Sequence, residues 1–162
     1  MNVFVVYESM FGNTAEVARA IARGADASTC AEVHEITPSD VAGADLLIVG
    51  GPTHAFSMSR PSTRHGAVEQ GAVPSVEDLG LREWLAGLPD HLDAPVATFD
   101  TRAAKVRHLP GSAAKAAAKV LRRRTHVLDR ESFYVDDTTG PLLPGELRRA
   151  EAWGRATCEA GA

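Results

Sequence analysis

Side chains able to bind an anion lie close together in Ser9-Met10-Phe11-Gly12-Asn13-Thr14. Residues 3–7 before them are β-branched and aromatic, which predicts a strand buried on both faces. After them, one apolar helical face predicts a helix ending near Gly24, formed by Val17, Ala18, Ile21 and Ala22. The first N–H groups of a helix lack partners and its dipole is positive there. The segment therefore predicts a phosphate-binding turn.

Two later segments follow predicted strands and share the edge of the sheet where open α/β folds bind ligands. The first, residues 53–76, comes directly after the strand expected at 45–50. The second, residues 101–109, comes after the strand expected at 94–100. No residue in either segment stands out as a catalytic acid, base or nucleophile.

Residues 7–14, Tyr-Glu-Ser-Met-Phe-Gly-Asn-Thr, resemble the FMN-phosphate loop of the flavodoxin family. Ser9, Asn13 and Thr14 match that loop residue by residue, whereas Met10 and Phe11 replace hydroxyl residues and offer only backbone N–H groups. The alternative is that Gly-Asn is an ordinary turn and Thr14 an ordinary helix N-cap.

The resemblance implies two further loops around the isoalloxazine ring. The first contains Pro52, Thr53, His54 and Phe56, and the second contains Phe99, Asp100, Thr101 and Arg102. The N–H groups of Thr53 and His54 are expected to reach flavin atoms, with His54 or Phe56 stacked on the ring. Alternatively, Phe56 and Phe99 are core residues.

These loops are unusually basic for the family. They bring seven basic residues against Asp100 and Glu69: Arg60, Arg64, His65, Arg102, Lys105, Arg107 and His108. Flavodoxins surround the flavin with acidic residues, which lower its potential, whereas a nearby arginine raises it. The alternative is that these bases face water in a mobile loop.

The remaining pattern predicts an α/β fold that forms one domain over residues 1–162. Strands are expected at 31–36, 45–50, 94–100 and 125–135, the last with a kink or bulge; helices are expected at 76–88, from Ser112 to Arg124, and from Glu146 onward. Residues 53–76 show no period and are expected to form a long ligand-facing loop. The resemblance implies a doubly wound three-layer sandwich with five parallel strands in the order 2-1-3-4-5.

Composition excludes several classes of function. The net charge of −4 argues against general nucleic-acid binding, and no apolar run is long enough to span a membrane. Cys30 and Cys158 are isolated, which indicates reduced thiols and no metal site. A cytoplasmic location is expected.

Three functions are consistent with the sequence. The first is an FMN-binding protein that transfers electrons between protein partners, favoured by the absence of a nicotinamide-binding motif. The second is an FMN-dependent NAD(P)H:quinone reductase or protoporphyrinogen-oxidase-like enzyme, favoured by the basic ring loops. The third is a flavodoxin fold that has lost flavin binding.

Overall fold

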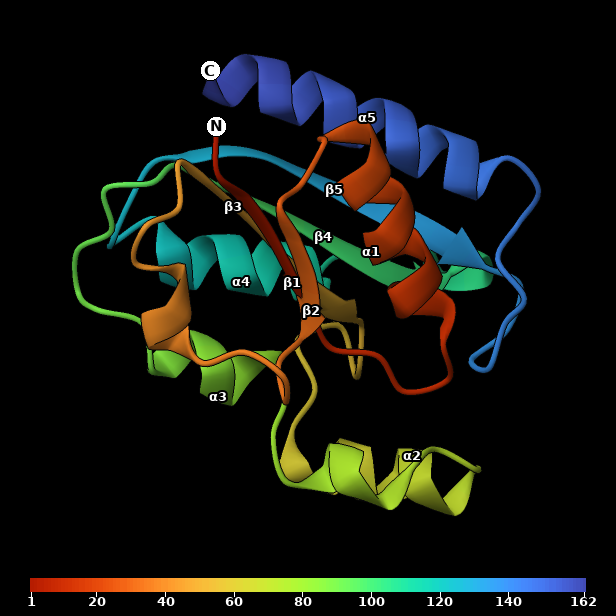
Figure 1. The fold of residues 1–162 in the computed structure, drawn as a ribbon. Helices are drawn as coiled ribbons and strands as arrows, with labels where there is room; N and C mark the ends of the chain where they lie inside the picture. The colour runs from red at the N-terminus through yellow and green to blue at the C-terminus, as the bar shows by residue number, and fades with distance from the viewer.

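The computed structural model describes all 162 residues and contains one parallel sheet. Its strands are β1 (Val3–Tyr7), β2 (Thr29–Glu32), β3 (Leu46–Pro52), β4 (Val96–Ala103) and β5 (Val127–Val135). They pair in the order β2-β1-β3-β4-β5, which confirms the predicted doubly wound fold. One face packs on α1 (Asn13–Gly24) and α5 (Glu146–Gly161), and the other on α3 (Leu81–Ala86) and α4 (Ala113–Leu121) (Figure 1).

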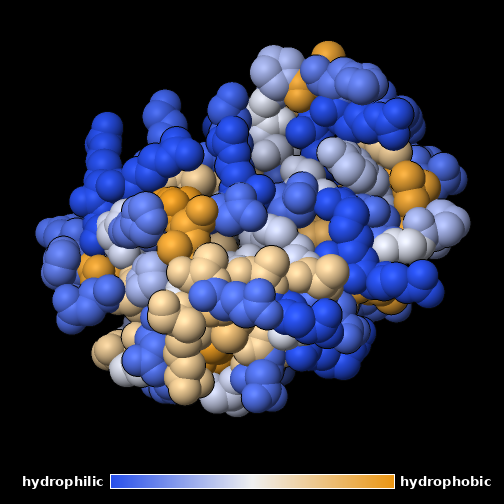
Figure 2. Space-filling model, turned by 90° about the horizontal axis from the view of Figure 1, so that it is seen from above, coloured by the Kyte–Doolittle hydropathy of each residue, from blue (hydrophilic) through white to orange (hydrophobic).

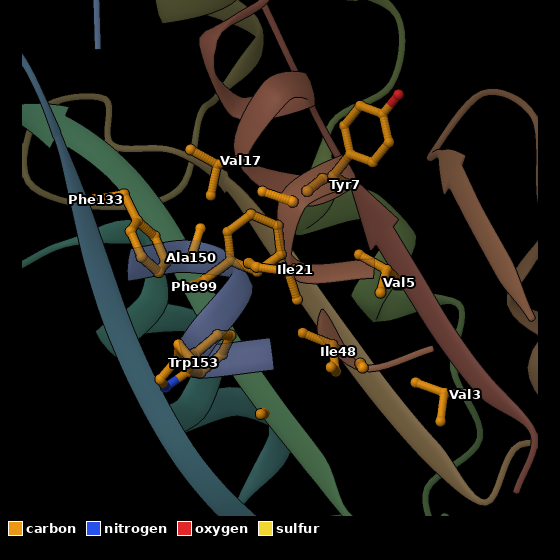
Figure 3. Packing of buried hydrophobic residues seen from close by; sticks show 14 of the residues in the cluster. Val3, Val5, Tyr7, Val17, Ile21, Ile48, Phe99, Phe133, Ala150 and Trp153 are labelled. Atoms are coloured by element: carbon orange, nitrogen blue, oxygen red, sulfur yellow. The ribbon is translucent and has the colours of Figure 1, made fainter. Parts of the chain in front are cut away.

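The core between the sheet, α1 and α5 holds the loop after β1 in place. Val3, Val5 and Ile48 project from the strands toward Ile21 of α1 (Figure 3). Trp153 of α5 packs edge-on against Phe99 and Phe133, with ring centroids 6.4 and 6.1 Å away. The two helices approach closely at Gly154, where a Cβ would collide with the Ile21 carbonyl oxygen. This packing fixes the position of the α1 N-terminus.

The outward face of the α5 layer is mostly hydrophilic, with one broad, weakly hydrophobic patch and smaller hydrophobic groups elsewhere (Figure 2). The buried side of α5 carries Ala150, Trp153 and Thr157, whereas Arg148 and Arg155 are exposed. No helix in the structure has both the length and the apolar character of a membrane span.

The predicted boundaries of the second strand and of the helix at 76–88 are wrong. β2 ends at Glu32, and residues 33–36 form a turn that buries Val33 and Ile36. The alternation of apolar and polar residues that predicted a strand here arises because these two apolar residues are buried by the turn. Residues 76–88 contain only the short α3, preceded by a 3-10 turn at Pro74–Glu77.

The expectation of a structureless loop over residues 53–76 is also wrong, because this segment contains α2 (Pro61–Glu69). In Figure 1, α2 lies outside the three layers. It has no readable apolar period because only Arg64 and Ala67 are buried. Ala67 packs with Met10, Ala72 and Val76 in a small separate cluster, so α2 rests against the loop after β1.

The end of β4 also differs from the prediction, whereas the bulge that was predicted in β5 is present. β4 continues to Ala103, so Thr101 and Arg102 are strand residues, opposite Phe133 and Tyr134, rather than parts of a loop. β5 is continuous through residues 129–131, and its irregularity is a register shift beside Val96 that leaves Leu128 out of the pairing.

Candidate functional site

A cavity of about 270 Å³ lies at the carboxyl ends of β1, β3 and β4. This is the point where the strand order reverses, between β1 and β3, and where doubly wound sheets bind ligands. Three segments supply most of its wall: residues 10–14, residues 52–56 and residues 101–106. All of the predicted site residues line it except Ser9, Gly12, Phe99 and Asp100.

The turn after β1, residues 9–14, is shaped by Gly12 and Ser9. Gly12 is the N-cap of α1 with a left-handed φ of 94°. The Ser9 hydroxyl oxygen accepts hydrogen bonds from the N–H groups of Gly12 and Ala15, both at 3.2 Å. Ser9 therefore organises the turn from within.

Five N–H groups of this turn have no partner in the protein, and four of them belong to residues of the cavity wall. Those of Met10, Phe11, Asn13 and Thr14 donate to no backbone or side-chain acceptor. They lie at the positive end of the α1 dipole and belong to residues of the cavity wall. The arrangement suits a phosphate group without requiring a lysine or arginine.

A buried hydroxyl pair connects this turn to β4. The Oγ1 atoms of Thr14 and Thr101 are 2.7 Å apart. On the other side, the Asn13 amide donates to the Thr139 carbonyl oxygen at 3.0 Å. The turn is therefore held at both ends by distant parts of the chain.

Thr14→Val is expected to weaken FMN binding about tenfold, and riboflavin binding much less, because only FMN carries a phosphate. Thr101→Val is the matched control, since it removes the same hydroxyl pair from the opposite side. Fluorescence titration with both flavins measures the difference. Equal losses for FMN and riboflavin in Thr14→Val would contradict a phosphate role for this turn.

In the segment after β3, the two N–H groups that were expected to reach a ligand already donate within the protein. The Thr53 N–H donates to the Thr101 carbonyl oxygen at 2.8 Å, and the His54 N–H donates to the Ser57 carbonyl oxygen at 2.8 Å. Both expected donors are thus already used. The His54 ring lies 3.0 Å from the Thr63 hydroxyl, and burial, with the nearby Arg64, lowers its pKa, which favours the neutral imidazole.

The tip of this segment presents an aromatic side chain at the cavity. Ala55 and Phe56 have φ values of 48° and 62° in the tight turn between His54 and Ser57. Non-glycine residues rarely adopt this conformation. The Phe56 side chain is 49% exposed although it lines the cavity, a position that suits stacking on a flat ligand.

The side chains of Phe99 and Asp100 do not reach the cavity, which corrects the prediction that these two residues contact the ligand. Phe99 is completely buried against Trp153, as Figure 3 shows. Asp100 points to the other face of the sheet, where its Oδ2 accepts from the Ala114 N–H at 2.8 Å, and burial raises the pKa of its carboxyl group. Side chains alternate along a strand, so Phe99 and Asp100 point to opposite faces of the sheet. Only the later residues of β4, nearer its carboxyl end, line the cavity.

Among the seven predicted basic residues, Arg102 and Lys105 line the cavity. Arg102 is 8% exposed, and its Nη2 donates to the carbonyl oxygens of Val106 at 2.9 Å and Leu109 at 3.1 Å. Its buried Nε has no partner, which leaves a donor for an acceptor atom of a ligand. The other five lie outside the cavity wall: Arg60, Arg64, His65, Arg107 and His108.

A buried polar cluster next to the turn was missed by sequence reasoning. Glu8 is 1% exposed; it accepts hydrogen bonds from the Ser59 hydroxyl at 2.6 Å and the Leu81 N–H at 2.6 Å. Arg64, fully buried, donates to Ser59 at 2.9 Å and pairs with Glu83 at 2.7 Å. The cluster joins the end of β1 to α2 and α3. The one signal in the sequence that could have indicated this cluster was a carboxylate directly after an apolar strand.

Glu8→Ala is expected to lower the unfolding free energy by about 2–4 kcal/mol, because the Ser59 hydroxyl and the Leu81 N–H lose their shared acceptor. Burial raises the pKa of Glu8 above its value in the unfolded chain. Stability is therefore highest below the unfolded-chain pKa and falls as pH rises through the folded-state pKa. Urea unfolding across this range should show a smaller fall for Glu8→Gln. An unchanged pH dependence would exclude Glu8 as its source, and exposed Glu16→Gln is the control.

Comparison with known proteins identifies the fold. No family model and no curated protein matches the sequence. The structure is similar to a flavodoxin from the domain Archaea (18% identity, TM-score 0.65, 99% of each chain). It is also similar to two-electron reduced Megasphaera elsdenii flavodoxin (18%, 0.64, 97% of this chain and 98% of that one). A flavodoxin, WrbA-like protein from Agrobacterium tumefaciens is comparable (16%, 0.63, 99% and 96%).

Proposed function

Because the chain has the flavodoxin-like fold, we propose that it binds FMN and transfers electrons between protein partners. The observation that carries this proposal is the set of four unpartnered N–H groups at the α1 N-terminus, in the wall of the cavity at the switch point. They match the one part of FMN that requires a dedicated anion site, its phosphate.

Each part of the cavity then has a role. The N–H groups of residues 10, 11, 13 and 14 hold the phosphate, and Phe56 covers one side of the ring. Arg102 contributes positive charge to the wall beside the ring. FMN itself supplies the capacity to accept and release electrons; the protein supplies binding and electrostatics.

The composition of the cavity wall favours a carrier over an enzyme. It contains no Asp, Glu or Cys, and its one histidine, His54, lies within hydrogen-bond distance of Thr63. The one lysine of the wall, Lys105, is paired with Asp137 at 3.3 Å. A wall without a free acid, base or nucleophile suits the exchange of electrons better than the conversion of a substrate.

The second candidate is an FMN-dependent oxidoreductase that uses NAD(P)H and a quinone-type acceptor. It is favoured by Arg102 and Lys105 in the wall, because positive charge stabilises a ring that gains negative charge and so raises its potential.

Anaerobic mixing of the FMN-loaded protein with NADPH separates the two candidates. A carrier should keep its oxidised absorbance with NADPH alone, lose it when a catalytic amount of a flavoprotein reductase is added, and then reduce cytochrome c. Rapid bleaching by NADPH alone, followed by turnover with a quinone, would instead support the enzyme.

A further inference from the structure

A second cavity, of about 250 Å³, lies beside the edge strand β5. Its polar lining includes Arg102, Ser112, Lys115, Arg130, Ser132 and Tyr134. Arg102 also lines the first cavity, so the two are neighbours that share one side chain. Nothing in the proposed function uses the second cavity.

The sheet register explains why these side chains meet. Arg130, Ser132 and Tyr134 alternate along β5 and therefore share one face, opposite to that of buried Phe133. Ser132 pairs with Asp100, and Tyr134 pairs with Arg102. Ser112 and Lys115 come from the start of α4, next to this face.

The cations of this cavity form no ion pairs. Arg102, Lys115 and Arg130 take part in none of the ion pairs of the protein. The one carboxylate in the lining, Glu131, is already paired with Arg149 at 3.3 Å. Three unpaired cations in one small cavity stand out in a chain whose net charge is −4.

Arg102 provides an independent indication of a ligand. It is 8% exposed, yet its Nε has no hydrogen-bond partner. An unsatisfied buried donor is costly, and charged donors are more costly than neutral ones. The first N–H groups of α4 are already bonded: those of Ala113, Ala114 and Lys115 donate to side-chain oxygens. These three N–H groups are therefore not available to a ligand.

We propose that this second cavity binds a phosphate group, either of inorganic phosphate or of a nucleotide. Arginine guanidinium groups match phosphate oxygens with paired N–H donors, lysine adds a point charge, and the Tyr134 hydroxyl is a further donor. Asp100 beneath the cavity does not oppose an anion as strongly as its type suggests, because burial raises the pKa of its carboxyl group and favours the neutral acid.

Calorimetric titration with inorganic phosphate tests the proposal in the Gly12→Glu background, which places a carboxylate in the turn of the first cavity. One phosphate should bind per chain in phosphate-free buffer. Arg130→Ala and Lys115→Ala should each weaken it about tenfold. Lys119→Ala, which removes the same charge from α4 but outside this cavity, should leave it unchanged.

Absence of one-to-one binding, or an equal loss in Lys119→Ala, would overturn the proposal. ADP distinguishes the sources of the phosphate: tighter binding than phosphate indicates a nucleotide, and equal binding indicates free phosphate. The FMN proposal is tested on the wild-type chain and at the first cavity. Its failure is therefore distinguishable from failure of the phosphate proposal.

Discussion

Gly12→Glu is expected to abolish FMN binding, raising the dissociation constant at least about 100-fold, or about 2.7 kcal/mol. Gly12 is the N-cap of α1, between the free N–H groups of Phe11 and Asn13. No atom lies within 4 Å of a Cβ built there, so there is room for a side chain. A carboxylate in this turn repels the phosphate and occupies the positive end of the helix dipole.

The left-handed φ of 94° adds a cost that does not depend on charge. Any non-glycine side chain there costs about 1–2 kcal/mol. Gly12→Gln is the matched control, because it has the same length and the same strain without the charge, and it should weaken FMN about tenfold. Flavin fluorescence titration and thermal unfolding of both variants separate the effect of the charge from the effect of the backbone strain. Equal effects of Glu and Gln would show that strain alone acts, and unchanged affinity in both would remove the turn from the site.

Arg102→Gln is expected to lower the two-electron reduction potential of the bound flavin by about 40–60 mV. A unit charge a few ångströms away at an effective dielectric constant of about 20 contributes about 2–3 kcal/mol, and 30 mV corresponds to about 1.4 kcal/mol for two electrons. Removing the positive charge in the cavity wall destabilises a ring that gains negative charge, so the potential falls.

Equilibrium reduction against a reference dye measures this shift. Arg107→Gln is the control, because Arg107 is exposed and outside both cavities that Arg102 lines. It should move the potential by only a few millivolts, since exposed charges are screened. A potential that stays constant in Arg102→Gln would show that the guanidinium does not act on the ring.

The strands β1 and β3 and the two long helices were predictable because each is encoded in local pattern, whereas the strand order followed from the resemblance. β1 and β3 are continuous apolar runs, as strands buried on both faces must be. α1 begins after Gly12 and ends at Gly24, as its apolar face indicated. The turn at residues 9–14 was accessible for the same reason: its residue types and its place before a helix carry the signal.

Features that depend on tertiary contacts were not predictable. α2 is held by the buried Arg64 and by a few contacts with Met10, and nothing in its own pattern marks a helix. Arg64 and Arg102 both look like solvent-facing bases in the sequence, yet one completes a buried cluster and the other spans two cavities. Arg124 likewise caps the end of α3 by donating to the Leu85 and Leu88 carbonyl oxygens.

The visible absorption spectrum of the purified protein, recorded after adding FMN and dialysing, tests the central claim most directly. The account predicts a retained flavin band with a shape different from that of free FMN, at one flavin per chain, and no such retention of riboflavin at the same concentration. A colourless protein from which all added FMN dialyses away would contradict the proposed function while leaving the fold unchanged.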